Sequence, residues 1–169
     1  MMKTADTRVI AQPGRKIMFR LYTLTWIVLA FTGFGQMPIF KRYYISDIPG
    51  MAWSADFFAT HYIHYLGAIL LLGLIAFAAV DYLVLSRRRY RLSGAGFVRI
   101  ALLAGIVVTG VFRVLKNLPD IVFSPGTTMF IDLAHLGFMM LYLLAALFFA
   151  FTRSGWLVPK SGGLHHRAS

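Results

Sequence analysis

The chain alternates between long apolar runs and short polar segments. Four runs stand out, at about residues 18–37, 57–85, 97–115 and 129–151. Because an α-helix rises 1.5 Å per residue, about 20 apolar residues cross a hydrocarbon core of roughly 30 Å. Each run is close to that length or exceeds it. The pattern therefore predicts an all-α fold, a four-transmembrane-helix bundle over residues 16–153.

The segments at the two ends of the chain are typical of tails. Residues 1–15 contain a Gln-Pro-Gly turn signal and no helical or strand period, so we expect no regular structure there. Residues 154–169 are expected to form a second tail, in which His165 and His166 are solvated. The run at 18–37 is long for a signal peptide and no Ala-x-Ala site follows it, so we expect it to remain as the first helix.

Three polar segments join the runs. Residues 38–56 mix charged and aromatic side chains of the kind found at a membrane interface, 86–91 are dominated by arginine, and 117–127 contain turn residues. The third run carries Arg99 and Arg113 with 13 residues between them, about 20 Å of helix. That length is less than the membrane thickness, so one arginine must extend to the interface or find a partner inside.

Composition supports a membrane protein. Hydrophobic residues make up 59% of the chain and charged residues 14%, against roughly 45–50% and 25% in soluble domains. The absence of cysteine excludes disulfides, thiolate-ligated metals and covalent haem attachment. The net charge of +11 comes from basic residues that flank the apolar runs, so we expect no nucleic-acid binding.

The distribution of the basic residues predicts the orientation of the chain. All but four of the 17 lysines and arginines lie near the two termini or between the second and third runs. The four exceptions are Lys41, Arg42, Arg113 and Lys116. Under the positive-inside rule both termini are cytoplasmic, and the second and fourth helices both run inward from the outer face.

Three histidines lie inside apolar runs, where ionisable side chains are costly and therefore indicate a functional site. His64 follows Phe57 by about seven residues and His135 follows Thr128 by the same number, so each is expected roughly 10 Å from the outer boundary. His61 lies one turn before His64 on the same helix face.

Two imidazoles at one depth suit several roles. They could supply both axial bonds to a haem iron in the core of the bundle, and the lack of cysteine would make that haem non-covalent. A zinc or copper site formed by His61, His64, His135 and Asp132 is a second interpretation. Hydrogen bonding between helices is a third. We expect haem.

The residues also resemble a known family. An arginine-flanked first helix that ends in Thr32-Gly33, a second helix that opens on His64 and a fourth helix with Asp132 and His135 are similar to the four-helix cytochrome b subunits of respiratory formate dehydrogenases, nickel–iron hydrogenases and thiosulfate reductases. The resemblance covers about residues 15–153.

The resemblance implies a membrane-anchoring subunit that passes electrons between quinone and a periplasmic redox partner. The family usually carries two haems b. The ligands of the outer haem correspond to His64, or His61, with His135, whereas residues 17–22 and 147–149 hold no histidine for an inner haem. We therefore expect one haem b, in a hetero-oligomeric complex with an iron–sulfur or multihaem subunit at the bacterial inner membrane.

Further residues receive expected roles around that haem. Arg113, assisted by Lys116, either pairs with the haem propionates or anchors the third helix at the interface. Asp132 either hydrogen-bonds a ligand imidazole or favours the positive end of its helix. His61 either exchanges protons with a quinone in the outer half of the membrane or only hydrogen-bonds a propionate or a loop carbonyl.

Two functions of different class remain open at this point. The first is a cytochrome b subunit of a membrane oxidoreductase, with no catalytic chemistry of its own beyond quinone-linked electron transfer. The second is a haem-free four-helix scaffold or small transporter, in which the histidines are structural or relay protons.

Overall fold

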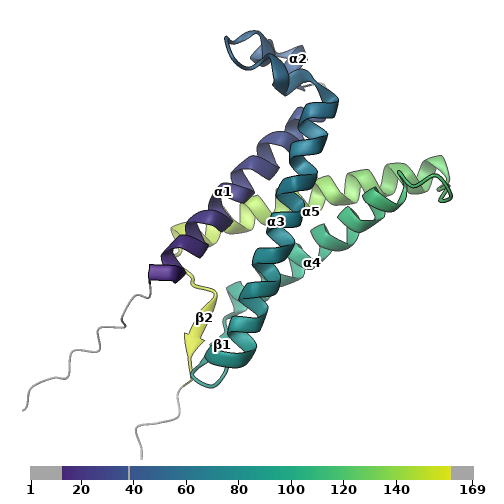
Figure 1. Cartoon of the computed structure of the whole chain (residues 1–169). Helices are drawn as coiled ribbons and strands as arrows, with labels where there is room; N and C mark the ends of the chain where they lie inside the picture. Colours follow the sequence, from purple (N-terminus) through teal and green to yellow (C-terminus); the bar gives the residue numbers. More distant parts are fainter. Residues whose placement is uncertain (1–12, 38, 161–169) are drawn as a thin grey trace, which may run out of the picture. The chain divides into compact units, whose positions relative to one another are not determined.

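The computed structural model describes residues 13–37 and 39–160. It is 76% helical with almost no sheet. Four helices are long and apolar enough to cross a membrane, as the sequence predicts: α1 (Pro13–Gly35), α3 (Phe57–Asp81), α4 (Gly94–Leu115) and α5 (Pro125–Phe151) (Figure 1). This is consistent with a multi-pass membrane protein. The expectations for residues 1–12 and 161–169, including His165 and His166, lie outside the described residues.

The chain packs as two units, residues 1–84 and 85–169. The first unit is built on α1 against α3 and the second on α4 against α5, so each is a helical hairpin. The segment expected as one domain, residues 16–153, therefore contains two hairpins. A π-helical turn, η3 (Tyr82–Ser86), extends α3 to the boundary between them, close to the predicted end at residue 85.

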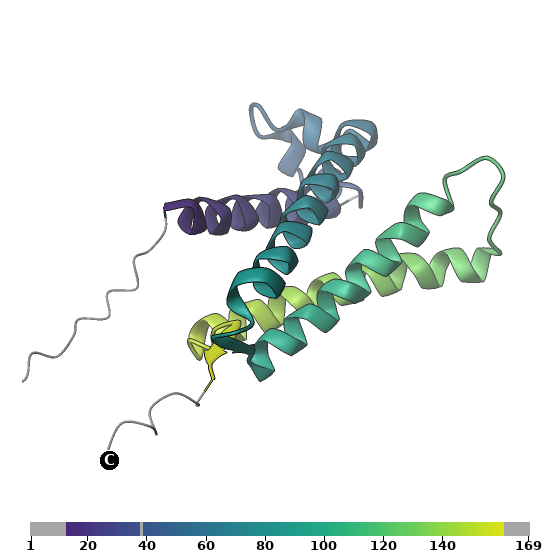
Figure 2. The same cartoon turned by 60° about the horizontal axis from the view of Figure 1, so that its bottom comes forward.

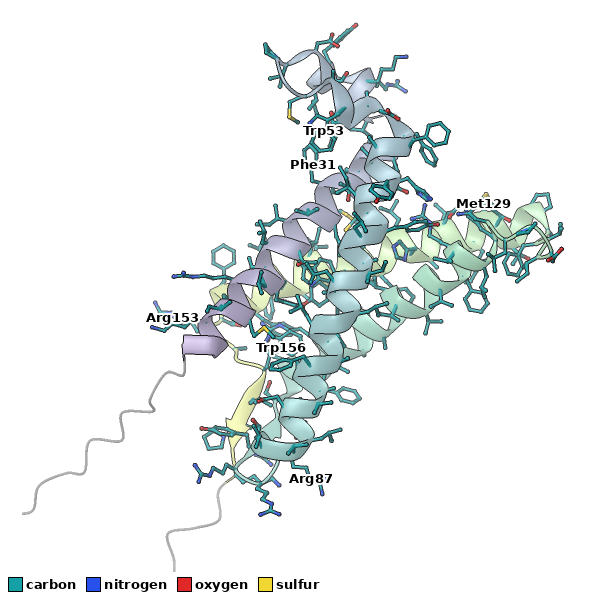
Figure 3. The ribbon with its side chains drawn as sticks, in the orientation of Figure 1. Phe31, Trp53, Arg87, Met129, Arg153 and Trp156 are labelled. Carbon is teal, nitrogen blue, oxygen red and sulfur yellow. The ribbon has the colours of Figure 1, made fainter. Side chains whose placement is uncertain are left out.

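The loop of the first hairpin is more ordered than the sequence suggests. It forms α2 (Ile39–Arg42) and two 3-10 turns, η1 (Ile45–Asp47) and η2 (Ala52–Ala55), at one end of α1 and α3 (Figure 1). The ring of Phe31 lies 5.7 Å from that of Trp53, and the two side chains are seen together in Figure 3. Aromatic packing therefore fixes the loop on the hairpin.

Threonines fill much of the interface between α1 and α3. Thr25, Thr32 and Thr60 are at most 4% exposed. Each hydroxyl donates to the carbonyl four residues earlier in its own helix, at 2.7–2.9 Å. This satisfies the hydroxyl proton within the helix, so each side chain can be buried without a further acceptor.

The helix starts follow from capping residues. Asp56 accepts hydrogen bonds from two backbone amides at the start of α3, and Ser93 and Ser124 each accept one at the starts of α4 and α5. Pro125 occupies the first turn of α5, where its missing N–H costs nothing. The fourth helix therefore begins before the predicted start near Met129.

A short antiparallel ribbon closes the second hairpin opposite its loop (Figure 2). Strand β1 (Tyr90–Leu92) pairs with β2 (Leu157–Pro159). The prediction of a loop at 86–91 and a tail from residue 154 missed this ribbon, because a three-residue strand has too few positions to display a period of two.

Arg99 connects the ribbon to the helices. The side chain is 7% exposed, and both terminal nitrogens donate to the carbonyl oxygen of Ser154, at 3.1 and 3.2 Å. Its guanidinium also lies over the rings of Phe149 and Trp156. The arginine finds its partner inside the hairpin, one of the two outcomes that the sequence left open.

Candidate functional site

His64 is held by a threonine of the neighbouring helix. Its Nδ1 lies 3.0 Å from Oγ1 of Thr32, and Thr32 is 1% exposed. The threonine hydroxyl has one proton, which it donates to the carbonyl oxygen of Val28 at 2.7 Å. Nδ1 of His64 must therefore donate to Oγ1. In the neutral ring the lone pair is then on Nε2, the nitrogen that can bind a metal.

His135 has the same arrangement in the second hairpin. Its Nδ1 lies 3.0 Å from Oγ1 of Thr109, which in turn donates to the carbonyl oxygen of Gly105 at 2.7 Å. The same reasoning places the proton on Nδ1 and the lone pair on Nε2. Both imidazoles are half-buried in their own hairpins.

A glycine follows each threonine and leaves room for the imidazole. A Cβ atom at Gly33 would lie 3.4 Å from Cε1 of His64, and one at Gly110 would lie 3.4 Å from Cε1 of His135. These distances are at the close limit of van der Waals contact. An alanine at either position would touch the ring, and a longer side chain would compete with the imidazole for this space.

A second polar pair lies one turn from each histidine. In the first hairpin Nδ1 of His61 lies 3.3 Å from Oε1 of Gln36. In the second, Nε of Arg113 donates to Asp132 at 3.0 Å. Gln36 and Arg113 each follow their threonine by four residues, and His61 and Asp132 each precede the half-buried histidine by three.

The two hairpins therefore share one pattern, Thr-Gly-x-x-(Gln/Arg) at the end of the first helix and (His/Asp)-x-x-His on the second, with Gln36 one residue beyond α1 and Arg113 inside α4. The buried positions correspond as well, at equal distances from the threonine or the histidine. The corresponding buried pairs are Trp26 with Leu103, Leu29 with Ile106, Thr60 with Ile131 and Leu71 with Tyr142. The two hairpins thus place their polar contacts and these buried side chains at equivalent positions, although the residue types differ.

His61 is enclosed by aromatic rings. The ring of Phe57 stacks on it, with centroids 5.2 Å apart and an angle of 18° between the planes, and the ring of Tyr65 lies 4.2 Å away. His61 contacts Gln36, one residue beyond α1, and His64 contacts Thr32 of α1, so the two histidines lie on one face of α3, as the sequence predicts. The counterpart of His61 in the second hairpin is an aspartate rather than a histidine.

Asp132 is the centre of an ion cluster. Nε of Arg113 and Nζ of Lys116 lie 3.0 and 2.6 Å from its carboxylate oxygens. Neither predicted role of Asp132 is found, because its contacts are two cations rather than an imidazole, and it lies two turns inside α5 rather than at its start. Arg113 and Lys116 carry one positive charge more than Asp132 neutralises.

The expectation of equal depth depends on where the helices begin. His64 follows the first residue of α3 by seven positions, whereas His135 follows the first residue of α5 by ten. The difference is roughly 4.5 Å of helix. Helix α4 likewise continues three residues further beyond its threonine than α1 does, so the second hairpin is one turn longer at this end.

The described residues contain no ready-made centre for a metal ion held by the protein alone. Within residues 13–37 and 39–160, no three His, Cys, Asp or Glu side chains form a group that could hold a metal ion. The zinc or copper interpretation therefore has no support. A haem iron would need only two axial donors, and Nε2 of His64 and Nε2 of His135 are the candidate donors.

Comparison of the chain with protein-family models, with curated proteins and with solved structures gave no match. The resemblance to cytochrome b subunits therefore stays a prediction.

The sequence reasoning missed the partners of the histidines. Thr32 was noted only as part of a Thr-Gly pair, and Thr109 and Gln36 were not singled out. The signal was available, because Thr-Gly occurs only twice in the chain, once in each hairpin.

Proposed function

We propose that the protein is a membrane cytochrome b that holds one non-covalent haem b through Nε2 of His64 and Nε2 of His135. The observation that carries the proposal is the repeated histidine–threonine contact, which gives both rings the tautomer that an axial ligand requires. A haem bound there would supply one-electron transfer between its ferric and ferrous states.

The equivalence of the hairpins also favours His64 over His61 as the ligand. His64 corresponds to His135, because both are held by the threonine of a Thr-Gly pair. His61 corresponds to Asp132, whose contacts are with Arg113 and Lys116. A ligand pair drawn from equivalent positions is therefore His64 with His135.

Arg113 and Lys116 are proposed to bind the haem propionates. Their surplus positive charge beside Asp132, within one turn of His135 along α5, suits an anionic group. In the competing interpretation, Arg113 anchors the end of α4 at the membrane interface. The same ion cluster supports this role, because Asp132 already compensates part of the charge of Arg113 and Lys116.

We further propose that the chain is a multi-pass protein of a bacterial inner membrane with both termini in the cytoplasm. It would pass electrons between the quinone pool and a periplasmic-side iron–sulfur or multihaem subunit. His61 is the proposed contact with quinone. Its Nδ1 is held by Gln36 and its ring by Phe57 and Tyr65, so the imidazole is fixed in one orientation for hydrogen bonding or proton exchange.

A haem-free scaffold or small transporter is the second candidate. It is favoured by the fact that each of the three histidines is already hydrogen-bonded inside its own hairpin, as structural histidines of membrane proteins are.

Substitution of single histidines separates the two candidates. His64→Ala and His135→Ala should each abolish the absorption of bound haem in the purified full chain, because the iron loses an axial donor for which the chain has no equivalent. His61→Ala should keep the haem and serves as the matched control on the same helix.

The same control tests the quinone contact. Haem reduction by a quinol analogue should be slower in His61→Ala than in the unaltered chain. Loss of haem in His61→Ala together with full haem in His64→Ala would contradict the ligand assignment. An unchanged rate of reduction would remove His61 from the quinone site.

A further inference from the structure

Two threonines hold equivalent positions next to the proposed ligands. Thr32 and Thr109 each accept a hydrogen bond from Nδ1 of a histidine at 3.0 Å while they donate to a carbonyl of their own helix at 2.7 Å. Because the hydroxyl donates its proton to a helix carbonyl, its oxygen becomes a stronger acceptor for the N–H of the imidazole. This chain of two hydrogen bonds occurs once in each hairpin.

Two other buried threonines of the first hairpin, Thr25 and Thr60, bond to a carbonyl of their own helix in the same way. Thr25 is 4% exposed and donates to the carbonyl oxygen of Leu21 at 2.8 Å, and Thr60 is fully buried and donates to that of Asp56 at 2.9 Å. The bond to the carbonyl four residues earlier is therefore a general device of this chain. The histidine contact is an additional feature of Thr32 and Thr109.

A hydrogen bond accepted from Nδ1 changes the ligand strength of Nε2. When Nδ1–H donates, electron density moves toward Nε2, the ring becomes more basic, and a ferric iron is stabilised relative to a ferrous one. The acceptor also fixes the direction in which Nε2 points. The first effect changes the reduction potential of the iron, and the second fixes the orientation of the imidazole. Neither requires the threonine to touch the haem.

We infer that Thr32 and Thr109 are positioning residues that orient the two axial histidines and jointly lower the reduction potential of the haem. The inference rests on the proposed haem function. Because the two contacts have the same length and each hydroxyl donates to a helix carbonyl, each threonine should contribute about equally, and the contributions should be independent, one acting through each ligand.

The test is a redox titration of the haem-loaded full chain with four single variants and one double variant. Thr32→Val and Thr109→Val remove the acceptor but keep the shape of the side chain. Thr32→Ser keeps a hydroxyl. Thr25→Val is the matched control, because it removes the same hydroxyl from the same helix without touching a histidine.

We expect each of the two valine variants at Thr32 and Thr109 to decrease the ferric-to-ferrous ratio at a fixed applied potential by roughly two- to tenfold, the effect of losing one hydrogen bond. The double variant should show the product of the two changes. Thr25→Val and Thr32→Ser should titrate like the unaltered chain. Loss of haem in Thr32→Val with retention in Thr32→Ser would equally support a positioning role.

Two results would overturn the inference while leaving the proposed function intact. In the first, the Thr32→Val and Thr109→Val variants bind haem and show the same redox titration as Thr25→Val. The other is loss of haem in both Thr32→Ser and Thr32→Val, which would assign Thr32 to packing. Absence of haem from the unaltered chain would instead overturn the proposed function itself.

Discussion

A threonine in an apolar helix is easily taken for a packing residue, because its hydroxyl can be satisfied by the helix itself. Thr32 and Thr109 show why this view is incomplete. Once the proton is given to the carbonyl, the oxygen still accepts, and in both hairpins the donor is a histidine. At the scale of single residues, the proposed function depends on these two oxygen atoms.

Asp132 provides a prediction at the same scale. Asp132→Asn should decrease the free energy of unfolding by about 1–2 kcal/mol, between the values for exposed and buried ion pairs, since Arg113 and Lys116 would face each other without a carboxylate. Thermal unfolding in detergent measures the change. Asp120→Asn, at an exposed position of the same hairpin, is the control and should have no effect. Equal stability of the two variants would show that the ion cluster contributes nothing.

At the scale of elements, the second hairpin depends on close contact between α4 and the ribbon. A Cβ atom at Gly96 would clash with the carbonyl oxygen of Trp156, whereas one at Gly94 would meet nothing within 4 Å. The same carbonyl accepts a hydrogen bond from the amide of Ser93 at 3.0 Å. The glycine is therefore required by the ribbon rather than by the helix.

Gly96→Ala should consequently loosen the ribbon. We expect faster hydrogen exchange at the amides of Ser93 and Lys160, which donate to Trp156 and Arg89, and a loss of stability of about 1–3 kcal/mol from overpacking. Gly94→Ala should leave both amides protected. Identical exchange in the two variants would contradict the proposed role of Gly96.

The helices themselves were predictable from the sequence, and much of the rest was not. Long apolar runs locate spanning helices because few other structures satisfy the backbone in lipid. Helix ends depend on capping, and the early start of α5 follows from Ser124 and Pro125, a signal that was present but not used. The ribbon was not predictable, because its strands form by pairing between residues 65 to 69 positions apart in the chain rather than by local preference.

The candidate site was predictable in its histidines and in the charged residues Arg113, Lys116 and Asp132, although the contact among these three was not foreseen. An ionisable side chain in a membrane span costs free energy, so its presence indicates a functional site. His61, His64 and His135 were identified for this reason. Their partners were not, because a hydroxyl in a helix gives no sign of which neighbouring side chain will reach it. The choice between His61 and His64 required the contacts of Gln36 and Thr32.

At the scale of the whole molecule, the chain consists of two hairpins with one ligand pattern. A haem iron binds axial ligands on two equivalent faces, and the proposed ligands His64 and His135 hold equivalent positions in their own hairpins. The pattern repeats, but its outer polar pair differs, since a neutral His61–Gln36 contact in one hairpin is replaced by an ion cluster in the other. A haem has two equivalent faces and one anionic edge, which carries its propionates. The proposed haem would use the equivalent histidines at its faces and the ion cluster at its edge.

The haem content of the purified full chain tests this account most directly. We expect a reduced-minus-oxidised optical spectrum of a low-spin haem b and one haem for each chain, because the proposed site uses a single pair of axial histidines, His64 and His135. A chain that carries no haem when it is isolated with its cofactor supply intact, or a ratio near two haems per chain, would contradict it.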